Sequence, residues 1–288
     1  MSGAVIVVTG ASSQIGYFLI PRLLAESYQV IAVSRKSAPE YFSKLQQQDS
    51  LTWASAQSLQ SLLAQSSFTL LSCGPLALLQ NILQDLDPQR IIALSSASIY
   101  FKQDSADTEE KQLMAAIIAA ENYLNLLAKN KQLELTILRP TLVYGCGLDK
   151  NLTRAANLIK RLGFLPIAAK AEGLRQPVHA EDIAVLIINL LSRSSLPVGS
   201  WSLAGGSCLS YRQMMVAVFK ALGKRPRLLP LPAWLLAICS KIILGISPAM
   251  IHRQNQNLNL DDLPARQQLG WKPRKFRLLL AELEHPTL

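Results

Sequence analysis

The sequence predicts an α/β protein with a doubly wound parallel β-sheet and a smaller, mainly helical second domain. Up to about residue 145, short apolar runs alternate with segments long enough to form crossover helices. That alternation is typical of a parallel sheet whose two faces are covered by helices. After Pro140 the alternation stops, and the rest of the chain is basic, interrupted by prolines and mostly helical in pattern. We therefore expect one domain from residues 1–145 and 179–206, and a second from 146–178 and 207–288.

Short apolar runs mark the expected strands, and longer segments between them mark the helices. The candidate strands are AVIVVTG (4–10), QVIAVSR (29–35), SLTWAS (50–55), FTLLSCG (68–74), RIIALSS (90–96) and LELTILRP (133–140). IGYFLIPRLLAES (15–27) and PLALLQNILQDL (75–86) are candidate crossover helices. Farther along, residues 151–163 and 179–193 have helical patterns, and GSWSLAGG (199–206) is expected to return to the sheet as another strand.

The composition indicates a globular protein that favours anionic partners. Of 288 residues, 50% are hydrophobic and 17% are charged, so we expect a large core and no extensive disorder. Lysine and arginine number 29 against 19 acidic residues, which gives a net charge of +10. Because the sequence has no zinc-finger pattern, no Lys/Arg run and no interleaved basic and aromatic residues, we do not expect nucleic-acid binding. A small anionic, phosphorylated molecule is the expected ligand.

The cysteines and histidines indicate neither a disulfide framework nor a metal site. Cys73, Cys146, Cys208 and Cys239 are far apart and form no C-x-x-C pair. This spacing is typical of reduced thiols in a cytoplasmic protein. The 3 histidines are not at metal-ligand spacing from another histidine or a cysteine, so no metal is expected.

Two segments bear on membrane targeting. The N-terminal MSGAVIVVTG has no basic region before its apolar run, so we do not expect a signal peptide. The apolar stretch from Leu228 to Met250 contains Pro230, Pro232, Lys241 and Pro248 and is too short between them to cross a bilayer. We expect a buried or half-buried helix there. The alternative is a helix that lies in a membrane interface and makes a weak contact with it.

The segment VVTGASSQIG joins the first expected strand to the first expected helix. Gly10 permits a tight turn, and Gly16 allows the helix to approach the sheet closely. Backbone N–H groups at the helix start would face a pyrophosphate. In the fingerprint G-x-x-G-x-x-G, the middle glycine is replaced by Ser13, which keeps the loop small and adds a hydroxyl donor. The expected dinucleotide contacts are Gly10, Ser12, Ser13, Gln14, Ile15 and Gly16.

The end of the second expected strand favours NADP(H). An NAD-preferring site places an acidic residue there to bind the ribose diol, whereas this sequence has Ser34 followed by Arg35 and Lys36. Arg35 could bind a 2′-phosphate through its charge and its paired donors. The alternative is that both cations are merely solvated and that NAD(H) is also accepted.

Five motifs in order give the chain a family resemblance. They are TGASSQIG, LSSASIY (94–100), LRPTLVYG, RQPVHAEDIA (175–184) and ARQQLGW (265–271). With them the sequence resembles the extended short-chain dehydrogenase/reductases, and most of all the NAD-dependent epimerase/dehydratase group that acts on nucleotide sugars. The resemblance implies a Rossmann domain, a small C-terminal substrate domain and reversible hydride transfer at a sugar carbon.

The resemblance also implies roles for individual residues. Ser96 corresponds to the serine or threonine that hydrogen-bonds the reacting hydroxyl or carbonyl group. Arg175 and Arg253 correspond to arginines that hold a substrate diphosphate through their planar donor forks. Besides the glycine loop, the expected cofactor site includes Cys73, Gly74, Ser95, Pro140, Thr141, Leu142 and Val143.

The acid/base pair of that family, Tyr-x-x-x-Lys on a helix, is missing from this sequence. In the family the lysine lowers the pKa of the tyrosine, and a glutamate follows the lysine by four residues. Counting back from Glu121 in LMAAIIAAENYL (113–124) places Leu113 at the tyrosine position and Ile117 at the lysine position. We therefore expect this helix to keep its packing role without its ordinary catalytic face.

Two replacements for the pair remain open. Tyr100, with Lys102 or Lys111, could supply the proton from the preceding loop. Alternatively, Ser96 and a bound water could suffice for a slow reduction. Packing alone would also explain a tyrosine at position 100.

Two hypotheses from different functional classes follow. The first is a cytoplasmic NADP(H)-binding oxidoreductase or epimerase-like enzyme, monomeric or homodimeric, that acts on a phosphorylated and nucleotide-linked substrate without the usual catalytic pair. The second is a redox-inert dinucleotide-binding sensor or assembly protein, in one version close to a membrane.

Overall fold

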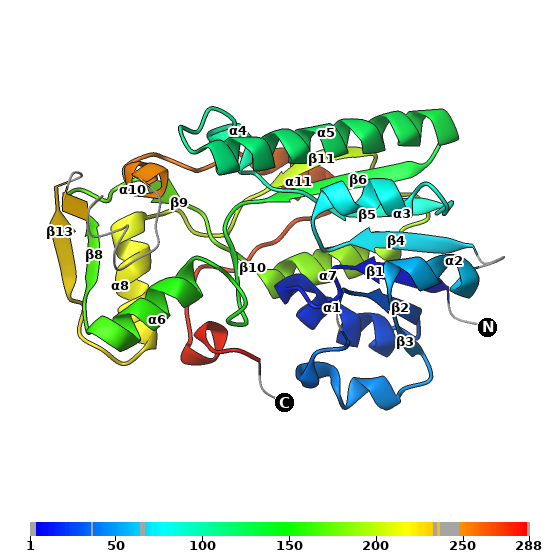
Figure 1. Ribbon diagram of the computed structural model, residues 1–288, viewed down its shortest axis with the longest axis horizontal. Coiled ribbons are helices and arrows are strands. Elements are labelled where there is room, and N and C mark those ends of the chain that lie inside the picture. Colours follow the sequence, from blue (N-terminus) through cyan, green and yellow to red (C-terminus); the bar gives the residue numbers. More distant parts are fainter. Residues whose placement is uncertain (1–3, 36, 64–66, 233–234, 237–247, 287–288) are drawn as a thin grey trace.

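The structure, a computed structural model, describes residues 4–35, 37–63, 67–232, 235–236 and 248–286. A central sheet with helices on both faces forms one end of the molecule (Figure 1). A smaller unit of helices and short strand pairs forms the other end. This arrangement confirms the predicted fold class.

Seven parallel strands form the central sheet in the order β11-β6-β5-β4-β1-β2-β3. Six of them fall in the apolar runs that the sequence marks as strands, and β11 is the predicted return strand. Their bounds are β1 Val5–Thr9, β2 Gln29–Val33, β3 Leu51–Ala54, β4 Phe68–Ser72, β5 Arg90–Leu94, β6 Glu134–Pro140 and β11 Gly199–Leu203. Since β2 and β4 lie on opposite sides of β1, the strand order reverses between β1 and β4. In open α/β sheets a ligand crevice lies at the carboxyl ends of such strands.

Helices cover both faces of this sheet. On one face α1 (Gln14–Ala25) packs against α7 (Ala180–Leu191). On the other face lies α5 (Thr108–Lys131), packed with smaller turns. These turns are α2 Leu59–Leu62, α3 Leu79–Ile82, α4 Ile99–Lys102 and the 3-10 turns η3 Ala56–Ser58 and η4 Leu76–Leu78. The 3-10 turns η1 Glu40–Phe42 and η2 Leu45–Gln47 pack instead on the face that α1 and α7 cover. The crossover helix expected over 75–86 is thus reduced to η4 and α3.

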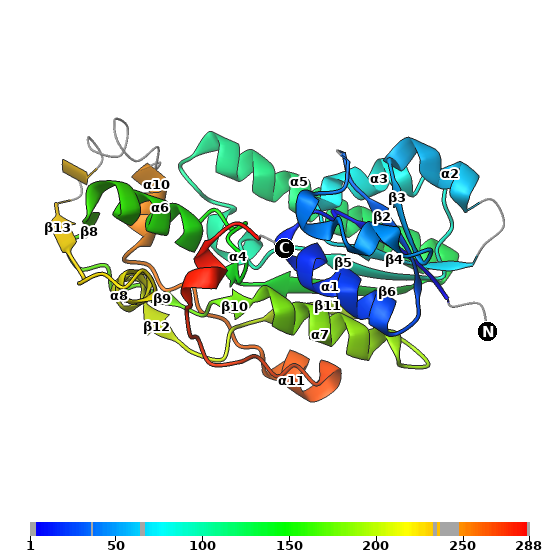
Figure 2. The same cartoon turned by 90° about the horizontal axis from the view of Figure 1, so that it is seen from below.

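The smaller unit has a core of its own, in which α6 packs against α8 (Figure 2). Three strand pairs, β8 with β13, β9 with β12 and β7 with β10, hold its loops together. The bounds are α6 Leu152–Leu162, α8 Tyr211–Ala221, α10 Pro248–Arg253, η6 Leu280–Leu283, β7 Val143–Tyr144, β8 Leu165–Ala168, β9 Leu174–Arg175, β10 Val178–His179, β12 Leu209–Ser210 and β13 Leu228–Leu231.

A late segment of the chain returns to the sheet. Helix α11 (Leu263–Leu269) packs beside β11, and the buried Trp271 donates its indole N–H to the Ala204 carbonyl at 2.9 Å. Both belong to the same hydrophobic cluster as α1 and α7. The segment that we expected in the second domain therefore stabilises the first.

The apolar stretch 228–250 does not begin as a helix. Leu228–Leu231 is strand β13, which pairs in parallel with β8. Residues 233–234 and 237–247, with Cys239 and Lys241, lie outside the described residues, so the expected buried or interfacial helix is not described. In the described parts of the chain, no helix is both long enough and apolar enough to span a bilayer.

A buried ion pair attaches α5 to the sheet. Glu121, on the inner face of α5, accepts a hydrogen bond from the Arg139 Nε at 2.9 Å and a second from the other arm of the same guanidinium. The Glu121 side chain is 5% exposed and that of Arg139, on β6, is 18% exposed. Because a desolvated charge is costly without its partner, this pair fixes which face of the helix meets the sheet.

Replacing Glu121 with alanine should lower the free energy of unfolding by about 3 kcal/mol, since the Arg139 charge would stay buried and unpaired. Urea denaturation of the purified variant measures this loss. The matched control is Lys131→Ala on the same helix, whose partner Asp87 is largely exposed. That change should cost less than about 1 kcal/mol. Equal losses in the two variants would contradict a structural role for the buried pair.

Candidate functional site

The turn after β1 and the turn after β4 meet backbone to backbone. Gly10 has a φ of +66°, and a Cβ added there would lie 2.3 Å from the Gly74 nitrogen. No side chain fits in this contact, and a positive φ favours glycine in any case. Gly10 and Gly74, both assigned to the cofactor site from the sequence, therefore lie together at the crevice between β1 and β4.

The start of α1 has the geometry of an anion site. Ser13 is its N-cap, and the Ser13 hydroxyl accepts a hydrogen bond from the Gly16 N–H at 3.2 Å. A Cβ on Gly16 would lie 2.1 Å from the Ala11 oxygen, so only glycine allows the helix to begin this close to the turn. The N–H groups of Gln14 and Ile15, in the first turn, have no acceptor within the helix and can bind an anion.

An aromatic residue that sequence analysis missed supports this loop. The Tyr41 hydroxyl donates a hydrogen bond to the Ser12 carbonyl at 2.9 Å, and its ring packs edge-on against Tyr17. Burial raises the pKa of Tyr41 to about 12, and the neighbouring Cys146 adds to this effect. Tyr41 therefore stays protonated and keeps donating, and nothing local in the sequence indicates this contact.

The cationic end of β2 lies beside the same loop. The Ala11 N–H donates to the Val33 carbonyl at 3.2 Å, which places Ser34 and Arg35 directly after the loop contact. Arg35 is exposed, and it has no hydrogen-bond or ion-pair partner among the residues that the structure describes. Lys36, the other expected contact, lies outside the described residues.

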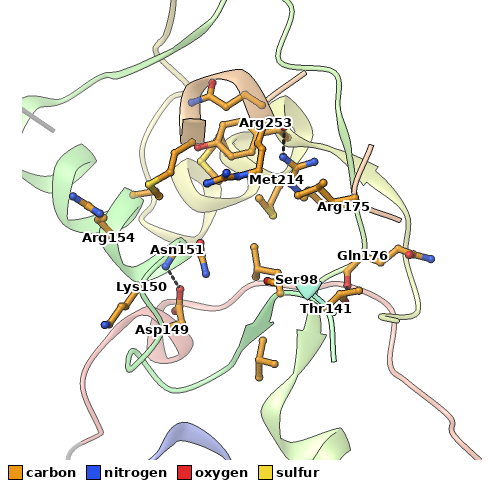
Figure 3. A pocket seen from close by; sticks show the side chains of 18 of the residues that line it. Ser98, Thr141, Asp149, Lys150, Asn151, Arg154, Arg175, Gln176, Met214 and Arg253 are labelled. Atoms are coloured by element: carbon orange, nitrogen blue, oxygen red, sulfur yellow. Dashed lines mark hydrogen bonds between the residues drawn. The ribbon is translucent and has the colours of Figure 1, made fainter. Parts of the chain in front are cut away.

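A pocket of about 630 Å³ opens between the sheet and the smaller unit (Figure 3). It brings together seven residues that the sequence assigns to cofactor or substrate: Gln14, Ser96, Thr141, Leu142, Val143, Arg175 and Arg253. Several assigned residues do not line it, namely Tyr100, Cys73, Gly74, Ser95 and Pro140. The glycine loop thus contributes Gln14 to this pocket, while its other members lie outside it.

Backbone contacts fix Ser96 at the pocket wall. The neighbouring Ser95 and Ala97 N–H groups donate to carbonyls of Leu138 and Pro140 at 2.8 and 3.0 Å. The Ser96 hydroxyl oxygen accepts the Ser98 N–H at 3.1 Å, which leaves its own O–H available to a ligand.

Two buried polar atoms beside this wall have no hydrogen-bond partner among the described residues. They are the Ser95 Oγ and the Gln14 Oε1. Gln14 uses its amide N–H₂ to donate to the Val143 carbonyl at 3.3 Å, so its oxygen is left as an acceptor. Buried groups of this kind usually have partners, which is what a bound polar ligand would supply.

Tyr100 is not brought to the pocket. It is 44% exposed, its hydroxyl accepts from the Arg139 Nη1 at 2.6 Å, and the guanidinium lies 5.5 Å from its ring centroid. Leu113 and Ile117, at the family's tyrosine and lysine positions, do not line the pocket either. Leu113 is 56% exposed, and Ile117 packs against the core beneath α5.

The two arginines expected to hold a diphosphate are both bonded internally. Arg253 makes a bidentate pair with Glu110, with both N–O distances at 2.6 Å. Arg175 is 6% exposed and donates to the carbonyls of Leu174, Gln256 and Arg253 at 2.6–2.8 Å. Burial lowers the pKa of the Arg175 guanidinium to about 10. The structure places both residues at the pocket but directs their donors into the protein.

Lys102, at the end of α4, lines the pocket beside this cluster. Its Nζ lies 3.5 Å from Glu110, which also accepts from the Ser105 hydroxyl at 2.9 Å. Burial lowers the pKa of the Lys102 ammonium, the charge of Arg253 lowers it further, and Glu110 opposes both. The pKa of Lys102 therefore lies below the ordinary value of a lysine, so the neutral amine forms at a lower pH than it does in a free lysine.

Sequence analysis missed the wall that α6 contributes. Lys150, Arg154 and Arg161 line the pocket. Figure 3 shows Arg154 and Lys150 on the side away from Ser98 and Thr141. The i, i+7 spacing of the two arginines on a helix that follows the Asp149 turn could have indicated this cluster. No group of side chains among the described residues could hold a metal ion.

Two curated proteins resemble part of this sequence. A UDP-glucose 4-epimerase from Vibrio cholerae is 27% identical over 173 residues, which cover 60% of this chain and 52% of that protein. The mitochondrial NADH dehydrogenase (ubiquinone) 1 alpha subcomplex subunit 9 of Arabidopsis thaliana is 27% identical over 129 residues, or 44% of this chain and 31% of that protein. This chain thus matches about half, or less, of the length of these curated relatives.

Solved structures show the same fold over nearly the whole chain. A UDP-glucuronic acid 4-epimerase from Bacillus cereus, in complex with UDP-glucuronic acid and NAD, has a TM-score of 0.70 at 17% identity and covers 97% of this chain and 96% of its own. The UDP-glucose 4-epimerase of Thermus thermophilus, in complex with NAD, has a TM-score of 0.70 at 16% identity and covers 97% of each chain.

The decisive match is at the level of the family. The model of the NAD dependent epimerase/dehydratase family matches residues 6–71 and 72–201, which is more than half of the sequence. These ranges contain the glycine loop, Ser96 and the strands that carry them. The chain therefore belongs to the NAD dependent epimerase/dehydratase family.

Proposed function

We propose that the protein binds a nicotinamide dinucleotide along the carboxyl edge of its sheet and uses it for redox chemistry on a nucleotide sugar. One observation carries the proposal: a single pocket joins Ser96, in the turn after β5, and Val143, on β7, to a basic wall from the smaller unit. Support comes from structurally similar epimerases that are described in complex with UDP sugars and NAD. The net charge of +10 suits an anionic substrate.

The residues of the crevice fit such a dinucleotide. Gly10 and Gly16 leave no room for a Cβ, and the first turn of α1 offers backbone N–H donors to a pyrophosphate. The unpartnered Gln14 oxygen lies where the loop meets the pocket. A bound nicotinamide would supply the acceptor or donor of a hydride at the sugar carbon.

Ser96 and Lys102 are the residues that we assign to proton handling. When a secondary hydroxyl of the sugar is oxidised, the Ser96 O–H bonds to the reacting oxygen and the neutral Lys102 amine takes the hydroxyl proton. In the reverse direction the Lys102 ammonium returns that proton to the carbonyl oxygen as the hydride arrives at carbon. Lys102 replaces Tyr100 in this role because it lines the pocket and Tyr100 does not.

The preference for NADP(H) rests on Arg35. This side chain is exposed, has no described partner and follows the strand end that contacts the glycine loop. A guanidinium at that place attracts a 2′-phosphate. The end of β2 has no carboxylate that would bind a ribose diol.

A second candidate function is a redox-inert dinucleotide-binding assembly protein. The α5 positions of the usual catalytic pair hold Leu113 and Ile117, neither of which can exchange a proton. The Arabidopsis relative is named as a subunit of NADH dehydrogenase. Turnover separates the candidates, because the assembly protein would bind NADPH yet consume none with a panel of UDP sugars and simple carbonyl compounds.

Replacing Arg35 with glutamate should reduce the preference for NADPH over NADH by at least about tenfold, because a carboxylate repels the 2′-phosphate. Nicotinamide fluorescence titrations with both cofactors measure the ratio of dissociation constants. Arg225→Glu, an exposed change in the smaller unit, should leave the ratio unaltered. The NADP(H) assignment is wrong if Arg35→Glu also leaves it unaltered.

Replacing Lys102 with methionine should slow the oxidation of the sugar by about 100-fold, the usual scale for loss of a general base. In the native enzyme the rate should rise with pH through the lowered pKa of Lys102, because only the neutral amine accepts a proton. Lys102→Met should abolish that rise, as measured by the rate of NADP⁺ reduction from neutral pH upward to the ordinary pKa of lysine.

The control for Lys102 is Lys111→Met, an exposed position on α5 outside the pocket, which should keep both the rate and the pH dependence. The NADPH dissociation constant should stay the same in both variants. A Lys102→Met enzyme with full activity and the native pH profile would refute the assignment and leave Ser96 with a bound water as the simpler chemistry.

A further inference from the structure

The pocket is lined by many more positive than negative side chains. Among the described residues that line it, the cations are Lys102, Lys150, Arg154, Arg161, Arg175 and Arg253, and the one carboxylate is Asp149. Asp149 is 8% exposed and accepts the N–H groups of Asn151 and Leu152 at 2.8 and 2.6 Å and the Thr153 hydroxyl at 2.6 Å. Its charge therefore stabilises the start of α6.

Lys102, Arg175 and Arg253 contact other groups of the protein through their charged ends. Glu110 binds both arms of Arg253 and lies 3.5 Å from the Lys102 Nζ. Arg175 is satisfied by three backbone carbonyls, and its guanidinium lies 5.7 Å from the ring centroid of Tyr211. Moving Arg253 onto a substrate would remove the bidentate partner of Glu110, and moving Arg175 would leave buried carbonyls without their donor. Either change costs free energy.

The other three cations form what we call the α6 wall, made of Lys150, Arg154 and Arg161. All three are exposed, and Lys150 and Arg161 have no hydrogen bond or ion pair within the described part of the chain. Along α6 the lining residues are Arg154, Ala155, Asn157, Leu158 and Arg161. All of them except Ala155 follow the i, i+3, i+4, i+7 pattern of one helix face. The face that α6 turns to the pocket thus carries two arginines and an amide beside the apolar Ala155 and Leu158.

The α6 wall also has a suitable position and reach. In Figure 3, Arg154 and Lys150 lie across the pocket from Ser98 and Thr141, which flank the Ser96 side. Two turns of helix separate Arg154 from Arg161, roughly 10 Å along the axis. Long arginine side chains at that spacing can converge on two linked phosphates, which their planar donor forks bind in pairs.

We propose that the α6 wall binds the diphosphate of the substrate, in place of the inward-bonded Arg175 and Arg253. The identity of the substrate as a nucleotide sugar rests on the function proposed above, whereas the diphosphate site rests on the wall itself. The sugar then extends from α6 toward Ser96, and the substrate is oriented by its charged end before any proton moves.

The test compares binding of inorganic pyrophosphate and of UDP by calorimetry, with NADPH saturating so that the glycine loop is filled. In the double variant Arg154→Ala, Arg161→Ala both dissociation constants should rise by at least about 100-fold, the scale of two lost hydrogen bonds to charged groups. The control is Lys160→Ala, Arg225→Ala, which removes the same charge from the same unit outside the pocket. It should change either constant by less than about twofold.

A second variant separates the α6 wall from the inward-bonded pair. Glu110→Gln, Arg253→Gln removes both partners of the ion pair and should leave the affinities for UDP and pyrophosphate within about twofold of native. A large loss of UDP affinity in this variant, with none in Arg154→Ala, Arg161→Ala, would overturn the proposal and return the diphosphate to Arg253.

The outcomes also distinguish this proposal from the function on which it draws. If UDP binds the native protein and the α6 double variant equally, the α6 wall does not bind the diphosphate, and the proposed nucleotide-sugar function stands. If pyrophosphate binding depends on the wall but UDP does not bind, the wall is supported and the nucleotide assignment fails. If neither probe binds while NADPH does, both fail.

Discussion

The contact between Gly10 and Gly74 is the constraint on which the rest of the structure depends. With no side chain between them, the turns after β1 and β4 meet directly, and α1 must begin immediately above this junction. That fixes the crevice at the point where the strand order reverses. The pocket, with Gln14 at its edge, then lies between the crevice and the smaller unit.

Helix α5 packs on the sheet but does not carry the Tyr-x-x-x-Lys pair that the family resemblance leads us to expect there. It keeps a buried carboxylate, Glu121, paired with Arg139 on the sheet, so its position is fixed by desolvated charge as well as by apolar packing. The α5 positions that match the family's tyrosine and lysine hold Leu113 and Ile117, whose side chains cannot transfer a proton, and Leu113 is exposed. Ser96 and Lys102, to which we assign proton transfer, lie instead in the turn and the short helix that precede α5.

Much of the fold could be predicted because its determinants are local. Apolar runs between helical segments, with glycine at positions 10 and 16, are visible in any short window of sequence. The internal bonds of the site could not be predicted in this way. Glu110 and Arg253 are 143 residues apart, and the carbonyls that satisfy Arg175 carry no signature in the sequence. An arginine matched to a family motif thus gives its position in the fold but not what its donors bind.

The Glu110–Arg253 pair also has a mechanical meaning. Glu110 belongs to α5 on the sheet, and Arg253 belongs to α10 in the smaller unit and lines the pocket, so one bidentate contact joins the two units beside it. With side chains 18% and 10% exposed, it is shielded from dissolved ions better than the exposed pair of Lys131 and Asp87. The two units are therefore joined by an ion pair that should persist at high ionic strength.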